Sequence, residues 1–180
     1  RSSHYMRNSI FFYLLGLLLS AGCAQSINWN DPIAIANHVQ IEQDDFKKVT
    51  SFIGPNLAEG PPDRLLLRAW KLRSGAMAYQ IYVEDEYTYE IRRGGLGWRF
   101  YSSAYDSDGN PLPTQKISRT VNWCGRNVCS YLEVLGIDIT REYLEKRKES
   151  GIAVKISGKN GEEVLSIPAA YVQAFLSVSP

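Results

Sequence analysis

Alternating apolar and polar positions run through the middle of the chain and predict antiparallel β structure. The clearest alternation covers 76–84, where nearly every second side chain is apolar and large. These positions, which we expect to face the core, are Met77, Tyr79, Ile81 and Val83. The turn dipeptide Ser74-Gly75 separates this run from a second one at 64–73, so the two runs predict a β-hairpin.

Further extended runs follow in order, separated from one another by turn-forming residues. We expect strands at 45–53, 98–105, 116–123, 128–139, 152–158 and 162–167. The last two flank Lys159-Asn160-Gly161, which contains the Asn-Gly pair typical of a tight hairpin turn. Consecutive strands joined by short turns predict an antiparallel meander.

Two short helices are expected near the C-terminus. Thr140 can cap a helix over 141–150, which Gly151 would end in the left-handed conformation. Pro168 suits the first position of a second helix that runs through Leu176. The predicted fold class is mainly β (α+β): an antiparallel β-sandwich or bent sheet of about seven to eight strands with these two helices. We expect a single domain over 45–180.

A leader segment precedes this domain. A short positive region, Met6-Arg7-Asn8-Ser9, is followed by an apolar run over 10–19 that is too short to span a bilayer comfortably. This pattern predicts a signal peptide over 1–22, with residues 1–5 interpreted as vector-derived or upstream sequence. The next stretch, 23–44, has no sustained apolar period, so we expect a tether after its first residue, Cys23.

The end of the leader, Leu19-Ser20-Ala21-Gly22-Cys23, resembles the lipobox of bacterial lipoprotein precursors. It departs from that pattern at Ser20, where the family prefers Leu. The resemblance implies that Cys23 receives a lipid, becomes the new N-terminus and anchors the chain to a membrane. In Gram-negative bacteria Ala24 would then imply the outer membrane, facing the periplasm, because an Asp after the cysteine favours inner-membrane retention. The alternatives are an ordinary signal peptide cut elsewhere and a buried hydrophobic helix.

The composition is that of an ordinary globular protein, with 44% hydrophobic and 22% charged residues. Removing Arg1 and Arg7 with the leader leaves 18 of the 20 basic residues, against 19 acidic ones. A nearly neutral domain has no strong positive field with which to attract a phosphate backbone. We therefore expect no nucleic-acid partner.

The cysteines fit an exported protein. If a lipid occupies Cys23, only Cys124 and Cys129 remain, and in an oxidising compartment this pair predicts a disulfide. Gly125 and Asn127 between them favour a turn that brings the sulfurs together. A redox pair or half of a zinc site is the alternative, but the spacing differs from that of redox motifs and no further ligand cluster completes a zinc site. We expect no metal and no cofactor.

Few residues in the sequence suit catalysis, so we expect no catalytic residues. His38 is the only histidine after the leader, and it lies in the expected tether. The segment 106–110 superficially resembles a calcium loop but lacks the glutamate that would close one, and its residues are those of a tight turn. The remaining catalytic alternative is a glycan hydrolase that uses carboxylates near a strand end, Glu84, Asp85, Glu86 or Glu90.

Aromatic and arginine side chains are concentrated between residues 79 and 105. Alternation along strands should place some of them outside the core, where Tyr, Trp and Arg favour partner contacts. The candidate partner-binding residues are Tyr87, Tyr89, Arg92, Arg93, Trp98, Arg99 and Tyr101. The alternative is that these side chains only pack the sheet.

These observations favour a noncatalytic envelope lipoprotein that binds another protein or a cell-wall component such as peptidoglycan. A cell-wall glycan hydrolase and a structural subunit of an envelope assembly are the two alternatives.

Overall fold

The computed structural model describes residues 26–58, 60–90 and 97–180, which form two antiparallel sheets and three short helices. The larger sheet has six strands in the order β1 (Gln40–Asp44), β2 (Val49–Ile53), β3 (Arg64–Lys71), β4 (Met77–Glu90), β8 (Val128–Ile139) and β7 (Thr114–Cys124). The smaller sheet has four, in the order β10 (Gly161–Ile167), β9 (Ile152–Gly158), β5 (Tyr101–Asp106) and β6 (Pro111–Leu112). This confirms the mainly β fold class, with ten strands where the sequence predicts seven or eight.

The core lies between the two sheets and the helices, and β4 carries the alternation that the sequence predicts. Tyr79, Ile81 and Val83 are buried in the core, while Met77 is half-buried at its margin. We call the face of the large sheet that carries these side chains the inner face. The opposite, outer face carries Gln80, Tyr82 and Glu84, because successive strand side chains alternate. From the small sheet, Ile156 and Leu165 pack into the same core.

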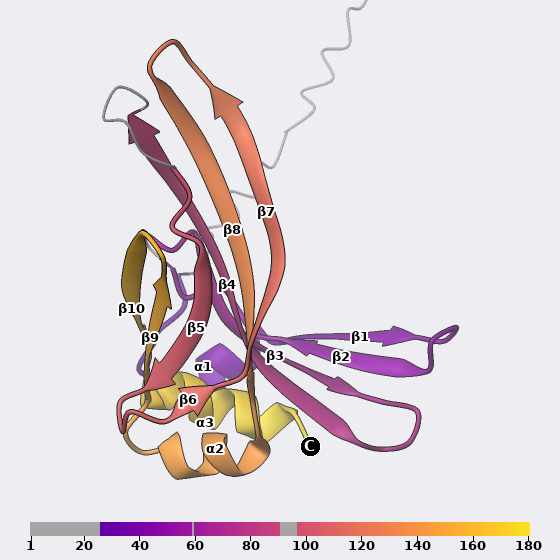
Figure 1. Ribbon diagram of the computed structural model, residues 1–180. Helices are drawn as coiled ribbons and strands as arrows, with labels where there is room; N and C mark the ends of the chain where they lie inside the picture. The colour runs from indigo at the N-terminus through magenta and orange to yellow at the C-terminus, as the bar shows by residue number, and fades with distance from the viewer. Residues whose placement is uncertain (1–25, 59, 91–96) are drawn as a thin grey trace, which may run out of the picture.

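The helices α2 (Arg141–Arg147) and α3 (Ala169–Val178) lie together at one end of the sheets (Figure 1). As predicted, the side chain of Thr140 caps α2 by accepting a hydrogen bond of 3.1 Å from the amide of Tyr143. Gly151 has a φ of 77°, and a Cβ there would lie 2.6 Å from the carbonyl oxygen of Ile167. This position therefore requires glycine both for its conformation and for space.

The prediction of a tether over 23–44 is wrong for most of its described part, 26–44. Residues 32–36 form α1 (Pro32–Ala36), capped by the carboxylate of Asp31, and β1 follows at once. Ile35 is fully buried, and Trp29 stacks on Tyr171 of α3 with ring centroids 6.2 Å apart. The helix is too short to show a 3.6-residue period in the sequence, so only its contacts with α3 reveal that this segment belongs to the domain.

Two strand boundaries also differ from the sequence prediction. In place of one strand at 45–53, residues 45–48 form the turn between β1 and β2. β5 begins at Tyr101 and not at Trp98, because Phe100 has a left-handed φ of 58° that breaks the extended conformation.

Three strands, β4, β8 and β7, extend past the small sheet as a long arm (Figure 1). The β7–β8 turn at its tip contains the predicted disulfide between Cys124 and Cys129, whose Cα atoms are 4.1 Å apart. No helix in the described ranges is long and apolar enough to cross a membrane. The leader, including Cys23, lies outside the described residues.

Candidate functional site

The structure divides the predicted partner-binding residues among three places. Tyr87, Tyr89, Trp98 and Arg99 lie on the inner side of the arm and are partly buried, whereas Tyr101 is completely buried where β5 enters the core. The prediction that Tyr101 contacts a partner is therefore wrong. Arg92 and Arg93 lie outside the described residues.

A completely buried carboxylate, Glu133 of β8, organises part of this group. The hydroxyl of Tyr87 donates to Glu133 at 2.6 Å, and the amides of Phe100 and Tyr101 donate to it at 2.9 and 3.1 Å. Arg119 of β7 completes the set with an ion pair of 2.7 Å. Because every bond joins β4, β7 or the start of β5 to β8, this cluster fastens the two sheets together.

A second buried carboxylate, Asp85 of β4, binds Arg99 at 2.6 Å and accepts a 2.9 Å hydrogen bond from the hydroxyl of Tyr101. Its other oxygen, Oδ1, is buried without a hydrogen-bond partner. Burial raises the pKa of Asp85 and outweighs the lowering effects of Arg99 and Tyr101. Arg99 is thus held by the core and does not offer a free guanidinium to a partner.

The remaining aromatic side chains of the arm pack on one another. Tyr131 of β8 stacks on Tyr87 at 6.0 Å between centroids and meets the edge of Trp98 at 4.8 Å. A Cβ at Gly97 would lie 2.4 Å from the Tyr131 ring, so this glycine allows the close approach. Packing therefore accounts for Tyr87, Trp98, Arg99 and Tyr101, and Tyr89 is the one described candidate for which no such contact is found.

The acidic residues of the hydrolase alternative do not form a carboxylate pair in a cleft. Asp85 is buried on the inner face, while Glu84, Glu86 and Glu90 alternate onto the outer face. Glu84 accepts hydrogen bonds from Tyr82 at 2.5 Å and from Arg64 at 3.3 Å. The pKa of Glu86 is lowered, chiefly by a hydrogen bond from Ser130 and then by one from Asn122.

The outer face contains a concavity that the sequence does not predict. We call it the outer-face groove, and its volume is about 550 Å³. Its lining includes Arg68, Trp70, Ala78, Gln80, Gln115, Ile117 and Asp138, from strands β3, β4, β7 and β8. No local signal reveals it, because these residues are neighbours only through strand register: Arg68 pairs with Gln80, and Gln80 with Asp138.

A continuous row of polar side chains crosses the groove. Arg68 donates to the amide oxygen of Gln80 at 2.5 and 3.0 Å, and the amide nitrogen of Gln80 donates to Asp138 at 2.7 Å. Gln115 donates to the other oxygen of Asp138 at 2.5 Å. A Cβ on Gly136 would lie 2.3 Å from the Gln80 side chain, so this glycine lets the amide lie flat across β8.

Aromatic rings border the row. The guanidinium carbon of Arg68 lies 4.8 Å from the centroid of Trp70 and 4.1 Å from that of Tyr82. Burial is the largest influence on Arg68 and lowers its pKa. Burial, followed by the hydrogen bond to Glu84, raises the pKa of Tyr82 to about 12. The groove thus presents a partly buried indole beside planar, hydrogen-bonded polar groups in fixed orientations.

No metal centre is indicated in the parts of the chain that the structure describes, where no group of three or more His, Cys, Asp or Glu side chains could hold an ion. In the loop 106–110 the Asp106 carboxylate accepts bonds from the amides of Asp108 and Asn110, at 2.9 and 2.8 Å, as in a tight turn. His38 bonds the carbonyl oxygen of Ala34 within its own segment at 2.8 Å.

Comparison with known protein families, with curated proteins and with solved structures gives no match.

Proposed function

We propose that the chain is a lipid-anchored, noncatalytic envelope protein whose β domain binds a cell-wall glycan through the outer-face groove. The observation that carries the proposal is the row Arg68–Gln80–Asp138–Gln115 beside Trp70. An aromatic ring packs against the C–H face of a sugar, while fixed amide and carboxylate groups bond its hydroxyls. The four strands hold these groups in place, so little ordering is needed on binding.

The groove suits a glycan better than a protein partner because few large apolar side chains line it. Among its lining residues only Trp70, which is partly buried, and Ile117, which is exposed, are large apolar side chains of the outer face. The centre of a protein–protein interface is usually richer in fully desolvated apolar anchors. A protein partner, or a structural role in an envelope assembly, remains an outcome of the test below.

The carboxylates favour a noncatalytic role. A glycosidase needs one acid whose raised pKa keeps the proton at neutral pH, beside a second carboxylate across the substrate. At this end of β4, Glu86 is exposed but has a lowered pKa, whereas Asp85 has a raised pKa but is completely buried. Neither combines the access and the protonation that a general acid requires.

The membrane anchor rests on the leader and on Cys23, and the fold adds one consideration. Ile27 and Trp29 already pack on the core, only a few residues after Cys23. A lipid on Cys23 would therefore hold the domain close to the membrane with almost no free tether. Ala24 supports an outer-membrane location on the periplasmic side.

Co-sedimentation with isolated peptidoglycan sacculi, followed by titration with soluble glycan fragments, tests the proposal. Trp70→Ala should weaken binding on the order of tenfold or more, because it removes the stacking ring. Trp123→Ala is the matched control, since Trp123 is also a partly exposed tryptophan of the large sheet but does not line the groove. Unfolding midpoints of both variants should stay near that of the wild type.

Equal binding by Trp70→Ala and the wild type would exclude the groove as the glycan site. Release of soluble fragments from the sacculi, abolished by Glu86→Gln, would replace the noncatalytic function by a hydrolase. Binding of an envelope protein but not of sacculi, with the same dependence on Trp70, would assign the groove to a protein partner.

A further inference from the structure

The turns of two hairpins carry exposed apolar side chains next to cations. Phe46, in the β1–β2 turn, is completely exposed, and Leu72, just after β3, is 43% exposed. Lys47 and Lys48 follow Phe46, and Lys71 and Arg73 flank Leu72. Both turns project from the same side of the molecule (Figure 1). We call these six residues the hairpin-tip site.

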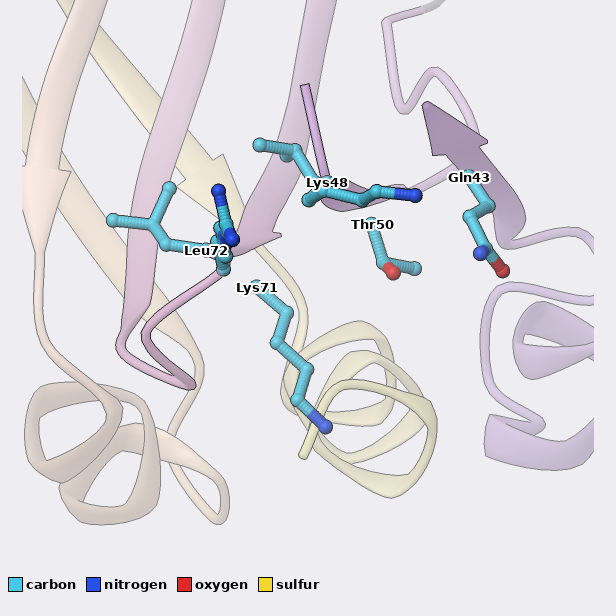
Figure 2. Close-up of a pocket in the computed structure, with 7 residues that line it drawn as sticks. Gln43, Lys48, Thr50, Lys71 and Leu72 are labelled. Carbon is cyan, nitrogen blue, oxygen red and sulfur yellow. The ribbon is translucent and has the colours of Figure 1, made fainter. Parts of the chain in front are cut away.

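Three of the four cations of the hairpin-tip site line a concavity of about 360 Å³. Lys48 and Lys71 line it together with the neutral side chains of Gln43 and Thr50 (Figure 2). Arg73 also belongs to its lining. Strand register builds it, because Thr50 pairs with Gln43 on one side and with Lys71 on the other. No acidic residue of the described chain lines the concavity, and we find no ion pair for these three cations within the described ranges.

Hydrogen bonds within the β1–β2 turn hold Phe46 outward. The carboxylate of Asp44 accepts bonds from the amides of Phe46 and Lys47 at 3.0 and 2.9 Å. Lys48 has a left-handed φ of 57°, a conformation that costs about 1 kcal/mol for a residue with a Cβ. The turn is thus ordered by its own contacts while its largest apolar side chain is left in water.

We propose that the hairpin-tip site docks the domain on a bilayer, with Lys48, Lys71 and Arg73 binding the phosphates of anionic lipid headgroups. Phe46 and Leu72 then enter the interfacial region, where an aromatic ring beside cations is favourable. The three cations that line the concavity match the negative charge of a phosphate group, and the exposed side chains of Phe46 and Leu72 distinguish a bilayer from a soluble anion. The inference rests on the proposed membrane anchor only in that an anchored domain stays near a bilayer.

Depth-dependent fluorescence quenching tests this docking on the full chain reconstituted into vesicles. Phe46→Trp places an indole at the tip, and lipids with brominated acyl chains quench an indole that enters the interface. In vesicles of phosphatidylcholine with phosphatidylglycerol, this variant should be quenched more than the wild type. Ile33→Trp, at an exposed apolar position on α1, is the matched control and should show no added quenching.

Removing the cations should release the tip. The combined change Lys48→Gln, Lys71→Gln and Arg73→Gln should weaken docking on the order of a hundredfold. Each cation near an anionic surface raises the affinity for the membrane about fivefold. Vesicles of phosphatidylcholine alone should give little added quenching. The same triple variant should still bind sacculi, so that failure of this proposal is distinguishable from failure of glycan binding.

Three outcomes would overturn the inference. One is quenching of Phe46→Trp no greater than that of Ile33→Trp. Another is quenching that persists without phosphatidylglycerol or without the three cations. The third is saturable binding of inorganic phosphate in the absence of vesicles, with no quenching when vesicles are present, which would assign the concavity to a soluble anion.

Discussion

Asp85 and Glu133 are register partners on β4 and β8, and both side chains are completely buried on the inner face. Each carboxylate has its own arginine: Arg99 lies 2.6 Å from Asp85, and Arg119 lies 2.7 Å from Glu133. Two buried like charges side by side are tolerated because each is compensated. The relationship predicts which substitutions will destabilise the fold and how stability depends on pH.

Glu133→Gln should lower the free energy of unfolding by about 3 kcal/mol, because it breaks a buried ion pair and leaves Arg119 without its counter-charge. Urea denaturation followed by circular dichroism measures the change. Glu162→Gln is the control, since Glu162 pairs with Lys155 at the surface and its loss should cost less than about 1 kcal/mol. Equal stabilities of the two variants would show that the Glu133 cluster does not hold the sheets together.

The raised pKa of Asp85 predicts a decrease in stability with rising pH. As pH rises above 3.8, Asp85 loses its proton in the unfolded chain while it keeps it in the folded protein. The free energy of unfolding therefore falls with rising pH until the pH exceeds the raised pKa of the folded state. The difference in unfolding free energy, wild type minus Asp85→Asn, should fall over this window and then stay constant. A difference that is flat or rises with pH would contradict the assignment.

Asp106 provides the control of opposite sign. Burial tends to raise its pKa, but hydrogen bonds from the side chain and amide of Asn110 and from the amide of Asp108, with Arg147 nearby, lower it overall. Its contribution is therefore present above the ordinary value of 3.8 and is lost as pH falls through the folded-state pKa. The difference in unfolding free energy, wild type minus Asp106→Asn, should decrease as pH falls. The corresponding difference for Asp85→Asn should increase as pH falls.

Tyr101 and Tyr89 should respond differently to truncation, although the sequence predicts both as contact residues. Tyr101→Ala should cost about 3 kcal/mol or more, because it empties a fully buried site and removes the hydroxyl that bonds Asp85. Tyr89→Ala should cost less than about 1 kcal/mol. If Tyr89→Ala proves as destabilising as Tyr101→Ala, the packed region extends to the end of β4, and Tyr89 is not available to a partner.

Loss of the disulfide should weaken the arm but leave the sheets intact. Replacing Cys124 and Cys129 by Ser should lower stability by about 2 kcal/mol or less, because the bridge closes only a short loop. Non-reducing peptide mapping should find the Cys124–Cys129 link in the exported protein, and the circular dichroism of the double variant should retain its β signal. Two freely alkylated thiols in the native protein would exclude the bridge.

Lipidation at Cys23 is tested by mass spectrometry of the protein from its native envelope. The mature chain should begin at Cys23 and carry acyl chains, and Cys23→Ser should accumulate as unprocessed precursor. A soluble mature protein without acyl chains would remove the lipid anchor from the proposed function and leave the glycan test unaffected.

Sequence reasoning predicted those elements whose signals are local. The alternation around Ile81, the capping side chain of Thr140 and the left-handed Gly151 each depend on neighbours a few residues away, and all three are confirmed. The short loop between Cys124 and Cys129 likewise restricts which cysteines can meet. In contrast, α1 is so short that its sequence has no period, and its place in the domain depends on contacts with α3.

By itself the sequence determined the mainly β class, the central strands and the disulfide, because alternation, turn chemistry and capping act within a few residues. Only the tertiary structure decided which aromatic side chains are buried and which polar groups meet. Tyr101 is buried because β5 passes beneath Glu133, and the groove exists because register aligns Arg68, Gln80 and Asp138. Such contacts join residues as far apart as Arg68 and Asp138, and their pairing is set by packing of the whole sheet, which no local pattern encodes.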